Sequence, residues 1–231
     1  MLDITGPLID GTFLSRPNRF LALVDLGGRT VSAHVPNSGR LTELLQPGQP
    51  VLVRPALRSP EATTSHDLIM VHRSGGLVSV DTRVPTLLVE SALRGGLIAE
   101  MAGYDHVRSE VVYGHSRLDF RLSRQNEECL VEVKSVTLVE QGQALFPDAP
   151  TQRGTRHLLE LLQARQQGFR AVIFFVVQRG DAIRMSPNDL TDPHFAATLR
   201  EVVHRGVEAI CYRCDVGRTQ IRLDARIPVQ L

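Results

Sequence analysis

Two short stretches hold the residues best suited to chemistry, "SRLDF" at 116–120 and "CLVEVKSV" at 129–136. Lys134 is the only lysine in the chain, because every other member of the 26 Lys and Arg residues is arginine. A bias toward arginine explains the ordinary basic positions. Arginine cannot replace lysine where a compact ammonium group must fit a tight site. We therefore ask which neighbours would require a lysine at this point.

Strand geometry brings two acidic residues close to Lys134. Side chains alternate between the faces of a strand, so Glu132 and Lys134 share one face. If the connection turns at Gln125 and Asn126, Asp119 on the preceding strand lies directly opposite Glu132. The Cβ atoms of such a pair are about 5 Å apart. A slip of one residue in this register would send Asp119 to the other face.

This constellation has a chemical interpretation and a structural alternative. Two carboxylates this close repel unless a cation lies between them, and oxygen ligands suit Mg²⁺ or Mn²⁺. Asp119 and Glu132 would hold the metal. Lys134 would position a water or stabilise developing negative charge, as in metal-assisted hydrolysis of a phosphodiester. The alternative is a solvated sheet face with a cross-strand ion pair.

The elements that must position this hairpin fall into two groups. Residues 7 to about 80 contain five or six short strands separated by Gly, Pro or Asn, which predicts a small β-barrel of the OB kind. "SGRLTELLQPG" fits one or two helical turns within it. We expect the first domain to span 1–82 and the second 83–231.

The second group alternates helices and strands, which predicts an α/β domain with a mixed sheet. Its helices are expected at "PTLLVESALRGG", at "TQRGTRHLLELLQARQQGF" and at "DPHFAATLREVVHRG". Asp192 is a candidate N-cap for the third helix, with Pro193 at its first position. "RAVIFFVVQ" is a continuous apolar run of strand length, so it is expected to be fully buried.

Composition excludes several classes of protein. No apolar run approaches the ~20 residues of a membrane span, and the first residues lack the pattern of a signal peptide, so we expect a cytoplasmic protein. A net charge of +1 rules out a general polycation. The "CYRC" cysteines point to opposite faces of a strand, which favours packing over zinc. P-loop and GxSxG motifs are missing from the sequence.

Two further segments are candidates for binding nucleic acid. In "HVPNSGR", Asn37, Ser38 and Arg40 form a turn that could present N–H groups to an anion, or a turn required only by the backbone. Arg153 and His157 are four residues apart at the start of a helix, where free N–H groups favour phosphate. The alternative is an ordinary polar helix start, with Asp148 or Thr151 as its N-cap. Further arginines lie near the first turn in sequence: Arg16, Arg19, Arg29, Arg54 and Arg58.

Several blocks together resemble the sugar fermentation stimulation protein A family. They are "RFLALVDL", "HVPNSGRL", "YGHSRLDF", "VEVKSVTL", "FPDAPTQRGTRHLLEL", "GFRAVIFFVVQR" and "GVEAICY", and they run along nearly the whole chain. The resemblance implies an N-terminal OB-like domain, a C-terminal domain like the PD-(D/E)XK nucleases, and DNA binding. It implies metal and catalytic roles for Asp119, Glu132 and Lys134, and it places Glu90 as the helical acid of the metal site.

The sequence leaves the function open between three alternatives. The first is a DNA-binding protein with a Mg²⁺- or Mn²⁺-dependent nuclease site. The second is a non-enzymatic DNA-binding regulator of sugar (maltose) metabolism with a relic of that site. The third is an enzyme that acts on RNA or on a small phosphorylated ligand. The sequence does not predict the oligomeric state.

Overall fold

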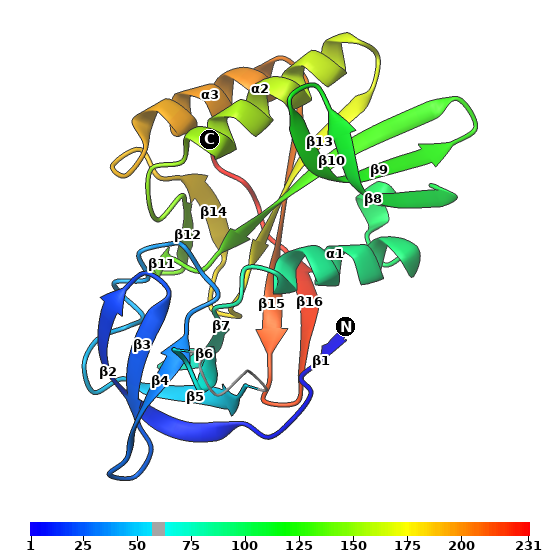
Figure 1. Ribbon diagram of the computed structural model, residues 1–231. Coiled ribbons are helices and arrows are strands. Elements are labelled where there is room, and N and C mark those ends of the chain that lie inside the picture. Colours follow the sequence, from blue (N-terminus) through cyan, green and yellow to red (C-terminus); the bar gives the residue numbers. More distant parts are fainter. Residues whose placement is uncertain (57–62) are drawn as a thin grey trace.

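A computed structural model describes residues 1–56 and 63–231. Arg58, one of the arginines near the first turn, lies outside these residues. The molecule has a barrel at its N-terminal end and a larger sheet covered by helices on both faces, with the two parts in contact (Figure 1). The sequence predicted this division into an OB-like barrel and a mixed-sheet α/β domain.

The N-terminal part is a closed barrel. Its strands are β2 (Ile9–Asn18), β3 (Leu21–Asp25), β4 (Thr30–His34), β5 (Pro50–Pro55), β6 (His66–Arg73) and β7 (Gly76–Ser79). They run in the order β4-β3-β2-β5-β6-β7. A β4–β6 pairing closes the first five of these strands into the barrel, and β7 pairs with β6 outside the closed ring. Alternate side chains point inward, so Ala22, Val24, Val31 and Ala33 are buried in its core.

The one or two helical turns expected within "SGRLTELLQPG" are found as a single turn and not as a regular helix. Residues 42–44 make a turn, and the N–H of Leu45 donates to the Leu41 carbonyl over a single turn. Leu41 has a positive φ of 52°, which ends any helix at that residue. Leu41, Leu44 and Leu45 are nevertheless buried. These three leucines fill part of the barrel core.

The C-terminal part is built on a seven-stranded mixed sheet. In spatial order its strands are β1 (Leu2–Asp3), β16 (Gln220–Arg226), β15 (Glu208–Val216), β13 (Arg170–Val177), β10 (Glu127–Val136), β9 (Ser116–Arg124) and β8 (His106–Tyr113). β10, β13 and β15 are parallel, and the remaining pairs are antiparallel. β13 is buried along nearly its whole length, as its continuous apolar sequence predicted.

Helices cover both faces of this sheet. α1 (Val84–Arg94) packs on one face, and α2 (Gln152–Gln166) and α3 (Pro193–His204) pack on the other. A short 3₁₀ helix, η1 (Ala99–Met101), follows α1. Side-chain oxygens of Thr151 and Asp192 accept N–H bonds at the starts of α2 and α3. These caps explain why both helices begin where the sequence predicted.

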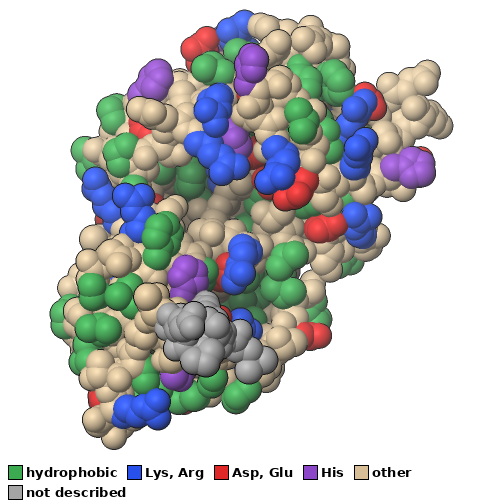
Figure 2. Space-filling view, in the orientation of Figure 1, with side chains coloured by type: hydrophobic (Ala, Val, Ile, Leu, Met, Phe, Trp, Pro, Cys, Tyr) green, Lys and Arg blue, Asp and Glu red, His purple; other side chains and the backbone are tan. Residues whose placement is uncertain are grey.

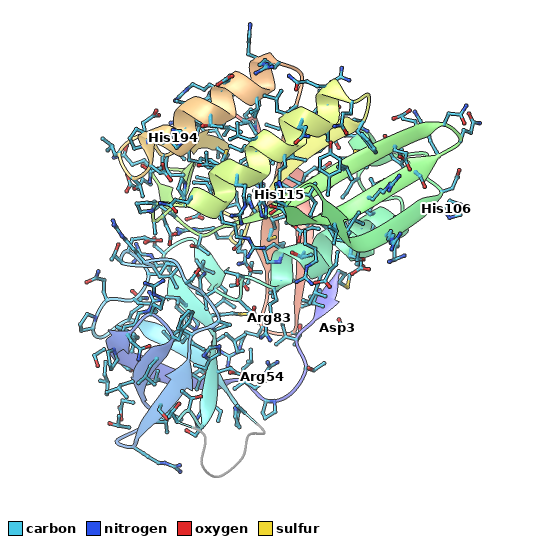
Figure 3. All side chains as sticks on the ribbon, turned by 45° about the horizontal axis from the view of Figure 1, so that its top comes forward. Asp3, Arg54, Arg83, His106, His115 and His194 are labelled. Atoms are coloured by element: carbon cyan, nitrogen blue, oxygen red, sulfur yellow. The ribbon has the colours of Figure 1, made fainter. Side chains whose placement is uncertain are left out.

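Two pairings extend the fold beyond the simple two-domain division. β1 pairs with β16, so residues 2 and 3 belong to the C-terminal sheet although they precede the barrel. β11 (Val139–Glu140), β12 (Gln143–Phe146) and β14 (Arg184–Pro187) form a separate small sheet. Around the seam that β1 helps to close lie Asp3, Arg54 of the barrel and Arg83 before α1 (Figure 3).

The β8–β9 hairpin projects from the sheet beside α2. His115 lies in its turn close to α2, where the backbone N–H of His115 donates to Glu160, and His106 lies at the opposite end of β8 (Figure 3). Cys211 and Cys214 are buried on opposite sides of the sheet and unbonded, in agreement with a packing role. No helix among the described residues is long and apolar enough to cross a membrane.

Candidate functional site

A cleft of about 410 Å³ lies where the barrel meets the C-terminal sheet. The barrel and the segment after it contribute Arg19, Asn37, Ser38, Gly39 and Thr82; the C-terminal part contributes Asp119, residues 132–135, residues 146–151, Arg153 and Gly154. Figure 2 shows basic side chains above and below the hollow that crosses the middle of this face. We call the C-terminal side, centred on Asp119, Glu132 and Lys134, the floor, and the barrel side the rim.

The predicted hairpin register is confirmed. β9 and β10 pair so that Arg124 lies opposite Glu127 and Phe120 opposite Val131, and continuing this register places Asp119 opposite Glu132. The ladder ends just before this pair. There Oδ2 of Asp119 accepts a hydrogen bond from the Val133 N–H at 2.7 Å. The side chain of Asp119 therefore replaces a backbone acceptor at the position where the two strands separate.

Glu132 is held by two partners on one of its oxygens. Nζ of Lys134 lies 2.6 Å from Oε1 of Glu132, and Nδ1 of His157 bonds the same oxygen. Glu132 is only 4% exposed and His157 only 1%. Oε2 of Glu132 is buried without a hydrogen-bond partner among the described residues. One oxygen of the carboxylate is thus fixed by the protein, and the other is available to a ligand.

The contacts of His157 indicate the role of each ring nitrogen. Nε of Arg153 donates to Nε2 of His157 at 3.3 Å, and a guanidinium nitrogen can only donate. Nε2 is therefore the acceptor, and Nδ1 carries the proton that bonds Glu132. A chain of bonds connects the cleft at Arg153 through the imidazole of His157 to Glu132. Because α2 carries both residues four positions apart, the helix fixes this chain.

The floor separates the pKa values of its two carboxyl groups. Burial, and then the negative charge of Glu132, raise the pKa of Asp119 from 3.8 to about 6. Burial also acts to raise the pKa of Glu132, but the hydrogen bond from His157 and the charge of Lys134 outweigh it, so that pKa is lowered. Divergent pKa values of adjacent carboxyl groups are a feature of catalytic sites.

The floor fits a divalent cation that takes few protein ligands. The free Oε2 of Glu132 and the adjacent Asp119 carboxylate provide two hard oxygen ligands, and Mg²⁺ is commonly bound by one or two carboxylates with water and phosphate. Within residues 1–56 and 63–231, no three His, Cys, Asp or Glu side chains are grouped as a metal cage. Such a site would depend on water or substrate oxygen for its other ligands.

Glu90, the third acid implied by the resemblance, is not brought to the cleft. It lies on α1, where Oε1 accepts hydrogen bonds from Arg94 at 2.8 Å and from Ser109 at 2.8 Å. α1 packs on the face of the sheet that holds Val131 and Val133, whereas Glu132 and Lys134 point toward α2. Glu90 does not line the cleft, and its contacts are those of a helix surface acid bonded to the β8 strand.

The predicted nucleic-acid contacts divide between exposed and buried residues. Asn37 is buried: its side chain donates to the Val80 carbonyl and accepts from the Gly39 N–H, so it shapes the turn. Ser38 and Arg40 are exposed, although only Ser38 lines the cleft. Direct contact of His157 with a nucleic-acid backbone does not fit its burial. Arg153 is exposed and reaches the cleft.

Two cleft residues were not singled out as site residues from the sequence. Arg19 is exposed and lines the rim. Asp148 lies against Gly39 so closely that a Cβ on Gly39 would meet Oδ2 of Asp148 at 2.2 Å. Asp148 thereby holds the rim turn against the C-terminal part. Asp148 is not the cap of α2, since Thr151 fills that position.

Comparisons with known proteins agree over the whole chain. The family model described as "Sugar fermentation stimulation protein RE domain" matches residues 83–220, and the model described as "SfsA N-terminal OB domain" matches residues 14–80. A sugar fermentation stimulation protein homolog from Moorella thermoacetica is 44% identical over 232 residues and covers 100% of both chains. A homolog from Chloroflexus aurantiacus is 44% identical over 228 residues, covering 99% of this chain and 88% of the other.

A solved structure extends the likeness to three dimensions. It is described as "The structure of Pyrococcus Furiosus SfsA in complex with Ca2+", and it matches with a TM-score of 0.90 and 30% identity over 100% of both chains. The barrel, the mixed sheet and both family models therefore all indicate the same family. The chain belongs to the sugar fermentation stimulation protein A family.

Proposed function

We propose that the cleft is the active site of a divalent-metal-dependent phosphodiesterase that binds and cleaves DNA. The observation that carries this proposal is the floor. Asp119 and Glu132 lie side by side on adjacent strands, with the Lys134 ammonium 2.6 Å from Glu132, at the bottom of an open cleft. The relative from Pyrococcus furiosus, whose structure is described as a complex with Ca²⁺, supports a cation site in a closely similar fold.

Each floor residue has a role in this proposal. Asp119 and Oε2 of Glu132 would hold Mg²⁺ or Mn²⁺, which supplies an activated water and neutralises charge on the phosphate. The Lys134 ammonium has three donors. One bonds Glu132, and the others can stabilise the negative charge that develops on a phosphate oxygen. His157 orients Glu132 from behind, which is a positioning role.

The residues around the floor would hold the nucleic-acid backbone. Arg153 reaches the cleft from α2, and Arg19 and Ser38 reach it from the rim. Arg40 is exposed beside the rim turn. Cationic and hydroxyl groups of this kind fix a phosphate backbone without reading its sequence. RNA presents the same backbone charge, so it is the comparison substrate for the assignment to DNA.

One observation favours the non-enzymatic alternative, a DNA-binding regulator of sugar metabolism. Oε1 of Glu132 is already bonded by both Lys134 and His157, and among the described residues no three acidic, His or Cys side chains are grouped as a metal cage. An ion pair of this kind can persist as a structural remnant after catalysis is lost. In that case the rim would still bind DNA, but the floor would not bind Mg²⁺.

Cleavage assays on single- and double-stranded DNA and on RNA, with Mg²⁺, Mn²⁺ or a chelator, test the proposal. Native protein and Lys134→Ala are compared. We expect metal-dependent cleavage of DNA by the native chain and its loss in the variant. DNA binding without cleavage in either metal, unchanged by the substitution, would support the regulator instead.

A further inference from the structure

We propose that the rim carries a stacking platform for an unpaired base, formed by Phe20 and His34, and that the DNA reaches the floor as a single strand. The inference deepens the proposed function by naming the substrate class, and it rests on that function for what happens at the floor. The platform itself is independent of it, because binding can be measured without cleavage.

Phe20 is unusual among the aromatic residues of the chain. Among the described residues, which contain all eight Phe and all three Tyr, it is the only Phe or Tyr classed as exposed, at 48%. Phe13, on strand β2 of the same barrel, is buried at 1% in the barrel core. The barrel therefore leaves one large aromatic ring in solvent, at the two-residue connection between β2 and β3.

The ring is backed by a second ring. The centroids of Phe20 and His34 are 6.4 Å apart, with planes inclined by 26°, in a stacked arrangement. His34 is the last residue of β4 and lies opposite Leu21, so the pair spans the β3–β4 surface of the barrel. In OB folds the first connection and this pair of strands form the surface used for oligonucleotides. A supported and exposed ring there is suited to stacking a base.

Arg16 connects the platform to the cleft. Its guanidinium donates to the backbone carbonyls of Arg19, Asn37 and Arg40, which joins the Phe20 connection to the rim turn. The Val35 N–H also donates to the Phe20 carbonyl at 2.9 Å. The rim turn lines the cleft. The platform and the cleft edge are therefore held together by these hydrogen bonds.

The charges at the platform and the cleft edge suit a phosphate backbone. Arg19, next to Phe20, lines the cleft, and Arg40 lies beside it; both are exposed, and neither forms an ion pair within the part of the chain that the structure describes. Arg153 faces them from the floor side. Basic side chains accordingly border the hollow on both sides in Figure 2. A groove of this character, with an aromatic ring at its edge, is typical of single-strand binding.

A base must be unpaired and unstacked to stack on such a platform. This requirement favours a single strand over a duplex as the substrate. In a duplex the flat faces of the bases are occupied by their neighbours, so Phe20 could contact only the backbone. The cleft volume of about 410 Å³ falls in the range of pockets that enclose one small ligand. It is suited to the end or bend of one strand.

The test measures binding of labelled 15-nucleotide DNA by fluorescence anisotropy, as a single strand and as a duplex, with chelator present so that cleavage is absent. We expect Phe20→Ala to weaken single-strand binding about 5- to 150-fold, the range for loss of one base stack, and to leave duplex binding unchanged. Phe20→Trp should retain binding. Leu87→Ala is the matched control, because Leu87 is also 48% exposed but lies on α1.

The outcomes separate this inference from the proposed function. If single-strand binding depends on Phe20 but the protein cleaves no substrate, the result would support the stacking platform and contradict the proposed nuclease activity. If the protein cleaves duplex and single strand equally and Phe20→Ala binds both as the native chain does, the result would overturn the stacking platform and leave the proposed nuclease activity standing. Tighter binding of an RNA strand of the same sequence, with the same dependence on Phe20, would overturn the assignment to DNA.

Discussion

The floor and the rim of the cleft are built on opposite physical principles. On the floor, the side chains bond to one another: Glu132 and His157 are at most 4% exposed, and Lys134 bonds Glu132. On the rim, the hydrogen bonds are made to backbone carbonyls, so the neighbouring side chains remain exposed to solvent. Arg16 holds three rim carbonyls, while Arg19 and Phe20 remain exposed.

This difference indicates that the floor is suited to catalysis and the rim to substrate binding. Chemistry needs groups whose positions and protonation are fixed before the substrate arrives, and burial with mutual hydrogen bonds achieves this. Binding a flexible polymer needs exposed charges and rings on a firm support. We therefore expect substitutions on the floor to change the rate of cleavage and substitutions on the rim to change affinity.

The largest expected effect is on the floor. Lys134→Ala should lower the single-turnover cleavage rate about 100- to 1000-fold, the usual cost of removing one donor to developing charge. Lys134→Arg should restore little of the cleavage rate, because a planar guanidinium group does not replace a compact ammonium group beside Glu132. Single-turnover rates at saturating protein measure this. Equal loss of DNA affinity in chelator would instead assign Lys134 to binding.

The next effect is on stability. The folded pKa of Asp119 is about 6 and its ordinary value is 3.8, so the folded state holds the proton more tightly than the unfolded state. The destabilising contribution of ionised Asp119 is therefore absent below about pH 4, grows as the pH rises through 6, and is complete above it, at no more than about 3 kcal/mol.

Asp119→Asn removes this charge while keeping an oxygen that can accept the Val133 N–H bond. In chelator, we expect the variant to be more stable than the native chain at pH 8 and equal to it near pH 4. Urea unfolding at the two pH values provides the measurement. A variant less stable than the native chain at pH 8 would mean that the ionised carboxylate stabilises the fold.

A smaller effect is expected behind the floor. His157→Ala should weaken Mn²⁺ binding about 10- to 100-fold, the usual cost of losing a group that orients a metal ligand. His157→Asn offers an N–H near the position of Nδ1 and should recover part of this affinity. Titration of Mn²⁺ followed by electron paramagnetic resonance measures both variants. Unchanged affinity in His157→Ala would leave His157 with a packing role only.

The smallest effect is expected at the rim. Arg19→Ala should weaken single-strand binding several-fold and reduce the slope of log affinity against log salt by about 0.7, since one phosphate contact is lost. The cleavage rate at saturation should not change. Arg29→Ala, which removes an exposed barrel arginine outside the cleft lining, is the control. Equal effects of both substitutions would mean that only net charge matters.

Much of the fold could be predicted because local signals were strong. The turn at Gln125 and Asn126 fixed the β9–β10 register, and this alone brought Asp119 opposite Glu132. The caps at Thr151 and Asp192 fixed the starts of two helices. In each case a few adjacent residues determine the backbone, so no distant contact was needed.

The parts that could not be predicted depend on contacts between distant segments. The four-residue spacing put Arg153 and His157 on one face, but only the packing of α2 on the sheet shows that this face turns inward to Glu132. β1 pairs with a strand more than 200 residues later. Arg19 is one of many arginines in sequence, and only the approach of the barrel to β10 brings it to the cleft.

Single-turnover cleavage of a labelled DNA strand in Mg²⁺, by the native chain and by Asp119→Asn, tests the central claim most directly. The variant is expected to be at least as stable as the native chain at pH 8, so loss of activity cannot be attributed to unfolding. We predict that the native chain cleaves, and that the variant binds the strand but does not cleave it. Equal cleavage by both, or cleavage by neither, would contradict a metal-dependent active site at this pair of carboxylates.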